Sequence, residues 1–145
     1  MSTRCVVTFK DSKEDGGAEW HVYRHHDGYP GTSHGVIAAL ACMFAEAKLC
    51  WELPRFEACE AAAAFVVTCK TRGGGIYLSK GPKAHGDLEW CYRVELKRDR
   101  ATPRLYVTVL RVDEAHNGAT KYTQVKKGVL ASVFAEYNAE EPADA

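Results

Sequence analysis

The stretch that decides the fold class is Leu88–Leu96, LEWCYRVEL, in which apolar and polar residues alternate. One face would hold Trp90, Tyr92, Val94 and Leu96, and the other Glu89, Cys91, Arg93 and Glu95. Successive side chains of a β-strand point to opposite faces, so this period of two predicts a strand with one covered face. After a turn at Arg98–Pro103, Arg104–Val112 predicts the return strand.

Four other segments show strand patterns. Thr3–Phe9 alternates, with Cys5, Val7 and Phe9 on one face and Arg4, Val6 and Thr8 on the other. Glu19–His25 is rich in β-forming residues, and the polar segment Asp11–Gly17 between them predicts a hairpin. Ile76–Leu78 predicts a short strand, and Thr120–Val125 an edge strand.

Two apolar faces at helical spacing predict helices over Val36–Leu49 and Phe56–Lys70. Pro54 suits the first turn of the second helix, and Gly73–Gly75 ends it. The apolar positions of Val129–Tyr137 predict a last helix. The order ββααββ(β)α predicts an α+β fold: an antiparallel sheet of about four to six strands, with two or three helices packed on one face.

Length and composition predict one domain over residues 1–139, followed by a flexible acidic tail at 140–145. The 145 residues hold 19 Lys and Arg against 19 Asp and Glu, which argues against a protein that binds polyanions over its whole surface. We find neither an apolar run of the roughly 18 residues that a membrane helix needs nor a signal-peptide pattern. These features predict a soluble, cytoplasmic protein that does not bind membranes.

Charge is unevenly distributed along the chain. Lys and Arg outnumber Asp and Glu between Lys70 and Gly128, and the reverse holds elsewhere. This asymmetry indicates either a polar partner surface or a basic sheet that acidic helices neutralise, and we favour the second interpretation.

The six cysteines favour reduced thiols over disulfides. They are Cys5, Cys42, Cys50, Cys59, Cys69 and Cys91. The count is even, but the chain shows no secretory signal, no Cys-x-x-Cys and no Cys/His spacing typical of zinc sites. We therefore expect six free thiols that act as small buried hydrophobic residues, with no metal and no cofactor.

The densest chemistry lies in Tyr23–Pro30, YRHHDGYP, where a strand gives way to a loop and a helix. A helix N-terminus after such a loop presents free N–H groups to an anion, and Arg24 could add a bidentate clamp. Asp87 and Glu89 would supply carboxylates for acid–base chemistry if the fold brought them near. The candidate ligand- or partner-binding residues are Arg24, His25, His26, Asp27, Tyr29, Thr32, Ser33, His34, Asp87 and Glu89.

A purely structural interpretation of the same segment stays open. Asp27 and Gly28 suit a tight turn, and the tyrosines suit a core with satisfied hydroxyls. Strand alternation would place Arg24 and His26 on one face, with His25 and Asp27 on the other. In either interpretation we expect a carboxylate of Asp27, Asp87 or Glu89 to hold Arg24, because it would relieve repulsion from the imidazoles.

The predicted strand pair around the turn also carries a basic set. It comprises Arg93, Lys97, Arg98, Arg100, Arg104 and Arg111, with Tyr92 and Tyr106 interleaved. Such a sheet face could bind nucleic acid. Glu95 and Asp99 dilute the charge, however, and the tyrosines are expected to point inward, so nucleic acid is not the expected partner.

Two blocks of the sequence resemble a family of small bacteriophage and prophage proteins. Tyr23–Pro30 resembles the family's Tyr-Arg-His-x-Asp-Gly-Tyr-Pro signature, and His85–Val94 resembles its Gly-Asp-x-Glu-aromatic-x-Tyr start of a strand. His26 stands where the family usually has an aromatic residue, most often tryptophan. The resemblance implies no established activity. It implies an accessory protein that acts by binding, including binding to components of host defence.

Two functions from different classes follow. The first is a non-catalytic interaction module with a protein partner or a small anionic ligand, and the missing catalytic motif favours it. The second is a small hydrolase or phosphate-ester-binding enzyme that uses the corner Arg24–Asp27, with or without a metal. Convergence in one open pocket of five residues, Arg24, His25, Asp27, Asp87 and Glu89, would favour the enzyme. The sequence leaves the oligomeric state open.

Overall fold

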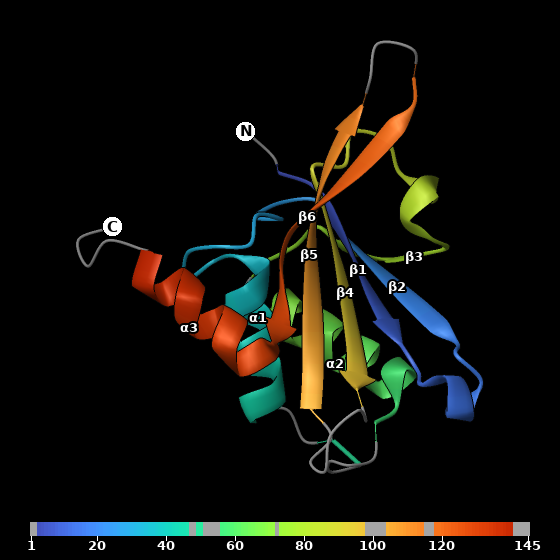
Figure 1. Ribbon diagram of the computed structural model, residues 1–145, viewed down its shortest axis with the longest axis vertical. Helices are drawn as coiled ribbons and strands as arrows, with labels where there is room; N and C mark the ends of the chain where they lie inside the picture. Colours follow the sequence, from blue (N-terminus) through green and yellow to red (C-terminus); the bar gives the residue numbers. More distant parts are fainter. Residues whose placement is uncertain are drawn as a thin grey trace.

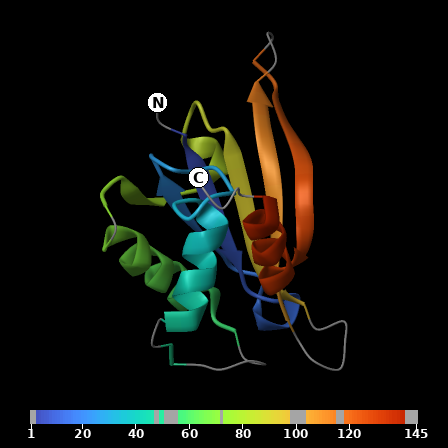
Figure 2. The same cartoon turned by 90° about the vertical axis from the view of Figure 1, so that its left-hand side faces the viewer.

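The computed structural model describes residues 3–46, 49–50, 56–71, 73–97, 104–114 and 118–140. Within these residues, one six-stranded sheet carries three α-helices on one face (Figures 1 and 2). The elements are β1 (Cys5–Lys10), β2 (Glu19–Arg24), α1 (Val36–Glu46), α2 (Ala58–Lys70), β3 (Ile76–Ser79), β4 (Trp90–Lys97), β5 (Arg104–Glu114), β6 (Thr120–Val129) and α3 (Leu130–Glu140). The α+β class is confirmed, and the order of elements is roughly as expected, with four strands between α2 and α3 in place of the two or three of the predicted order. None of the helices in the described part of the chain is long and apolar enough to cross a membrane.

The sheet is mixed, whereas the sequence predicted a purely antiparallel sheet. Its strand order is β3-β2-β1-β4-β5-β6, and the central pair β1 and β4 runs parallel. The β1–β2 hairpin leaves one edge of β1 free, and β4 adds to that edge after the chain has passed through both helices and β3. The alternation of side chains predicts which face of a strand is buried, but it is the same for a parallel and an antiparallel neighbour.

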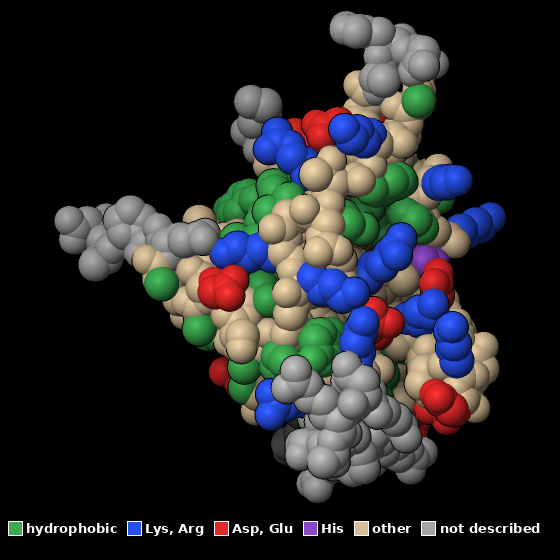
Figure 3. Space-filling view, in the orientation of Figure 1, with side chains coloured by type: hydrophobic (Ala, Val, Ile, Leu, Met, Phe, Trp, Pro, Cys, Tyr) green, Lys and Arg blue, Asp and Glu red, His purple; other side chains and the backbone are tan. Residues whose placement is uncertain are grey.

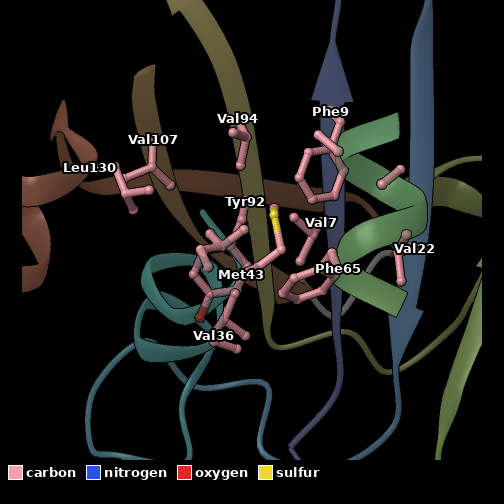
Figure 4. Close-up of a cluster of buried hydrophobic side chains, with 14 of the residues drawn as sticks. Val7, Phe9, Val22, Val36, Met43, Phe65, Tyr92, Val94, Val107 and Leu130 are labelled. Carbon is pink, nitrogen blue, oxygen red and sulfur yellow. The ribbon is translucent and has the colours of Figure 1, made fainter. Parts of the chain in front are cut away.

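The core lies between the sheet and the helices, as the alternation predicts. Tyr92, Val94 and Leu96 of β4 are buried on the side of the helices, beside the inward residues of β1. Figure 4 shows Tyr92 beside α1 and Phe9 beside α2, and the ring centroids of Phe9 and Phe65 lie 5.7 Å apart. Large-to-small changes at such positions leave cavities, so this layer dominates the packing energy.

Helix α2 begins at Ala58, two residues after the predicted start, and the reason is a long-range cap. The Ala58 backbone N–H donates to Oδ1 of Asp11 at 2.8 Å, and Asp11 lies in the loop between β1 and β2. Glu57, the residue before the helix, makes no side-chain cap of its own. A contact between residues so distant in sequence satisfies one of the free N–H groups at the helix start. Helix α1 ends at Glu46 and does not include Leu49.

The face of the sheet that none of the three α-helices covers, called the open face below, carries a second apolar cluster. Its members are Val6, Tyr23, Leu88, Cys91, Leu110 and Val112. Val6 and Cys91 point away from the helices as expected, but they are buried and not solvated. The Tyr23 ring stacks on His85, so the segment between β3 and β4 folds over part of this face.

All six cysteines lie in described parts of the chain, and none of them forms a disulfide bond. Cys5, Cys69 and Cys91 are buried as expected, whereas Cys50 and Cys59 are exposed, so the expectation of uniformly buried thiols was wrong. Burial raises the pKa of Cys91 to about 11 and that of Cys5 further. Since the thiolate is the reactive form, these two thiols are poor nucleophiles at neutral pH.

Candidate functional site: the β2–α1 corner and the open face of the sheet

The corner after β2 does not gather its charged residues around Arg24. The guanidinium Nη2 of Arg24 donates to the backbone carbonyl of His34 at 2.9 Å, on the side of the sheet that the helices cover. Its Nη1 is buried and has no hydrogen-bond partner among the described residues. The expected carboxylate partner was wrong, because Asp87 pairs with Arg4 at 3.3 Å instead. Arg4 precedes Cys5, which pairs with Arg24 in the register, so Arg4 and Arg24 point to opposite faces.

Hydrogen bonds to the sheet account for the turn itself. The Gly28 N–H donates to the Thr3 carbonyl at 2.8 Å, and the buried Tyr92 hydroxyl donates to the Gly28 carbonyl at 2.6 Å. Asp27 adopts a left-handed conformation with φ of 55° and accepts a 2.8 Å hydrogen bond from the Tyr29 hydroxyl. Burial, followed by the bond to Asp27, raises the pKa of Tyr29. These contacts support the structural interpretation of Asp27, Gly28 and Tyr29.

The start of α1 does not offer the predicted set of free N–H groups. The N–H groups of Gly35, Val36 and Ile37 donate to loop carbonyls of Thr32, Tyr29 and Pro30, at 3.2, 2.9 and 3.4 Å. Thr32, Ser33 and His34 are exposed, and the Thr32 hydroxyl accepts from the His34 N–H at 3.3 Å. Because the loop already satisfies these donors, the helix start is a weak anion site.

Polar aromatic residues gather instead on the open face at the end of β2. Tyr23 and His25 share a hydrogen bond of 2.8 Å between the hydroxyl and Nδ1, and the His26 ring packs edge-on against His25 at 4.7 Å. Strand β2 ends at Arg24, so the alternation that would have separated His25 from His26 does not reach them. Burial raises the pKa of Tyr23, while desolvation and the nearby Arg4 lower that of His25.

His85 joins this group from the segment between β3 and β4. Its ring lies parallel to Tyr23 with centroids 4.0 Å apart, and its Nε2 lies 2.8 Å from Ser79 Oγ. Of the predicted residues, the structure brings His25, His26 and Asp87 to this end of the sheet, and Glu89 presents an exposed side chain close by in sequence. Tyr23, Ser79 and His85 had been missed as site residues.

A pocket of about 480 Å³ opens on the same face. It is lined by Pro82, Lys83, His85, Gly86, Leu88, Val112, Glu114, Thr120 and Tyr122. Leu88 and Val112 are buried and give it an apolar surface, and the rings of His85 and Tyr122 line it as well. None of the ten predicted site residues lines this pocket. Its parts come from two segments that are separated by β4, and no local sequence pattern joins them.

A group of positive charges, called the basic strip below, extends from the middle of the open face toward the end opposite the pocket. Its members are Arg93 and Lys97 of β4, Arg104 of β5 and Lys127 of β6. In the register, Arg93 lies opposite Thr108 and Thr108 opposite Lys127, while Lys97 lies opposite Arg104. Figure 3 looks onto this face and shows Lys and Arg side chains gathered over its middle.

Tyr106 lies on the open face too, which corrects the expectation that both tyrosines of the strand pair point inward. It pairs with Glu95 in the register, and Lys97 Nζ lies 5.5 Å from the centroid of its ring. Tyr92 does point inward as expected. Arg111 points to the side of the helices, where it lies 5.8 Å from the Trp90 ring, and so does not join the strip. Arg98 and Arg100 fall outside the described residues.

Within the described ranges, no group of three or more His, Cys, Asp and Glu side chains is placed to hold a metal ion. No protein-family model, curated protein or solved structure matches the chain. The resemblance to phage proteins therefore stays a prediction from two sequence blocks.

Proposed function

We propose that this protein is a non-catalytic binding module whose partner docks on the open face of the sheet. The observation that carries the proposal is the composition of that face. A pocket lined by apolar, aromatic and charged side chains lies at one end, and the basic strip extends toward the other. Pockets that combine apolar walls with a few polar groups are the usual ligand sites of proteins.

The partner chemistry expected from the sequence, a protein or a small anionic ligand, is compatible with such a surface. An anionic group would gain from the basic strip, and an apolar or aromatic group from the pocket. The resemblance to phage proteins adds the proposal that the partner is a component of the bacterial host cell, in its cytoplasm.

The alternative of a small hydrolase or phosphate-ester-binding enzyme has less support. Arg24 and His25 point to opposite faces of the sheet, and the loop satisfies the N–H groups of α1 that would bind the anion. A catalytic group must lie within hydrogen-bond reach of the reacting atoms. Because Arg24 and His25 face opposite sides of the sheet, one substrate could not contact both side chains.

The test is capture from a bacterial lysate with the immobilised full chain and two matched variants. Tyr122→Ser removes a side chain that is 38% exposed at the pocket, and Val67→Ser removes one that is 63% exposed on α2. We expect wild type and Val67→Ser to retain the same components and Tyr122→Ser to retain them about tenfold less, as loss of a buried interface aromatic does. Equal retention by all three proteins, or no retention above blank resin, would contradict the proposal.

A further inference from the structure

We propose that the partner on the open face is a single-stranded nucleic acid, with its phosphates on the basic strip and one base in the pocket. This inference rests on the proposed function and names the partner class for the same surface.

The first step is the charge of the basic strip. Its four cations lie on three adjacent strands. Among them, in the described parts of those strands, lies one acidic side chain, Glu95, whose Oε1 is 4.0 Å from Lys97 Nζ. The neighbouring Lys97 side chain lowers the pKa of Lys127. Like charges on one face of a sheet repel each other, and a phosphate bound among them would relieve the repulsion. Neutralisation of phosphates by Lys and Arg is the main source of affinity for nucleic acids.

The second step is the presence of aromatic rings among these charges. Tyr106 stands inside the strip with Lys97 beside its ring, and Tyr122 and His85 line the pocket. Bases stack on such rings with little sequence preference, because every base has a π-face. A nucleic acid offers a planar ring and a phosphate at every nucleotide, whereas a peptide offers both features only where acidic and aromatic residues happen to lie side by side.

The third step is the distance between the two features. Val112 at the pocket and Arg104 in the strip both lie on β5, eight residues apart. At a rise of about 3.3 Å per residue they are separated by roughly 26 Å along the strand. That length matches a short single strand, close to the lower end of the roughly 4–16 nucleotides that small sheet-based domains cover. An unpaired base is required, because a base inside a duplex cannot leave the stack without a cost.

The experiment measures fluorescence anisotropy of labelled oligonucleotides, (U)12 and (dT)12, with the full chain between 50 and 200 mM salt. Lys127→Glu tests the strip and Tyr122→Ala the pocket. Lys121→Glu is the control, since Lys121 lies on the same strand opposite Asp113 and points to the other face. The oligonucleotide that binds with the higher affinity shows whether the protein prefers RNA or DNA, since both carry the same phosphates and similar bases.

We expect wild type and Lys121→Glu to bind at least one oligonucleotide, with an affinity that falls as salt rises. Lys127→Glu should weaken binding at least tenfold and reduce the salt slope by about 0.7, the value for one lost phosphate contact on a single strand. Tyr122→Ala should weaken binding about tenfold and leave the salt slope unchanged. The same sequence annealed to its complement should bind more weakly than the single strand.

Three outcomes would overturn the inference: no binding of either oligonucleotide, tighter binding of the duplex, or equal binding by all variants. A labelled twelve-residue peptide of Glu and Tyr serves as the second probe. If that peptide binds in a Lys127-dependent way and the oligonucleotides do not, the partner is an acidic protein, and the binding-module proposal still holds. If neither probe binds and lysate capture does not depend on Tyr122, both proposals fail.

Discussion

Replacement of Tyr92 tests the contact by which the core holds the β2–α1 corner in place. The side chain is fully buried, and its hydroxyl donates to the Gly28 carbonyl at 2.6 Å. Tyr92→Phe keeps the ring and removes the donor, which leaves a buried carbonyl unsatisfied and should cost about 1–3 kcal/mol of unfolding free energy. Tyr92→Ala also empties the space between β4 and α1, and such large-to-small changes at buried rings cost about 3–5 kcal/mol.

Urea unfolding followed by tryptophan fluorescence measures both variants against wild type. A loss below about 1 kcal/mol for Tyr92→Ala would place this residue on the surface and reverse the register of β4. A Tyr92→Phe variant as stable as wild type would mean that this hydrogen bond does not hold the corner.

The same pair of proteins gives a prediction for high pH. Burial raises the pKa of Tyr92 well above its ordinary value of 10.0, so the folded protein keeps this proton after the unfolded chain has lost it. The stabilisation is therefore fully present below about pH 10 and is lost as the pH rises through the folded pKa, by up to about 1.4 kcal/mol per pH unit. The stability gap between wild type and Tyr92→Phe should narrow between pH 9 and pH 11.5, whereas a constant gap would show that Tyr92 titrates alike in both states.

Three further predictions concern single sites. Cys59, exposed on α2, should react with a thiol reagent in the native protein, while the buried Cys5 should react only after unfolding; a total below six thiols in denaturant without reductant would indicate disulfides. Arg24→Ala should lower the unfolding free energy by about 1 kcal/mol, and Arg24→Lys should recover part of it, because the single bond to a backbone carbonyl needs one donor and not a planar fork. Gly28→Ala should cost about 1–3 kcal/mol in urea unfolding, since its Cβ would lie 2.7 Å from a backbone oxygen, while Gly73→Ala, whose Cβ meets nothing within 4 Å, should match wild type.

The site was harder to predict than the fold. The segment Tyr23–Pro30 is conspicuous in the sequence because it concentrates charged and aromatic residues. In the structure, hydrogen bonds from part of it hold a turn against the residues before β1 and against β4. The pocket and the basic strip draw on segments far apart in the chain, so no local pattern could have joined them. The face of the sheet to which the Tyr106 side chain points illustrates the difficulty. An outward tyrosine and an inward one look alike until the register with the neighbouring strand is known.

The sequence by itself determined the fold class, the helices and the covered face of each central strand. Period-two and helical repeats of apolar residues are local, and burial of an apolar face is the dominant favourable term in folding, so Tyr92 and Val7 could be assigned to the core in advance. Only the tertiary structure decided that β1 and β4 run parallel, that Arg4 and not Arg24 takes Asp87, and which side chains share the open face. Those facts depend on strand order and register, which come from contacts between residues distant in the chain. Such contacts produce no local repeat in the sequence.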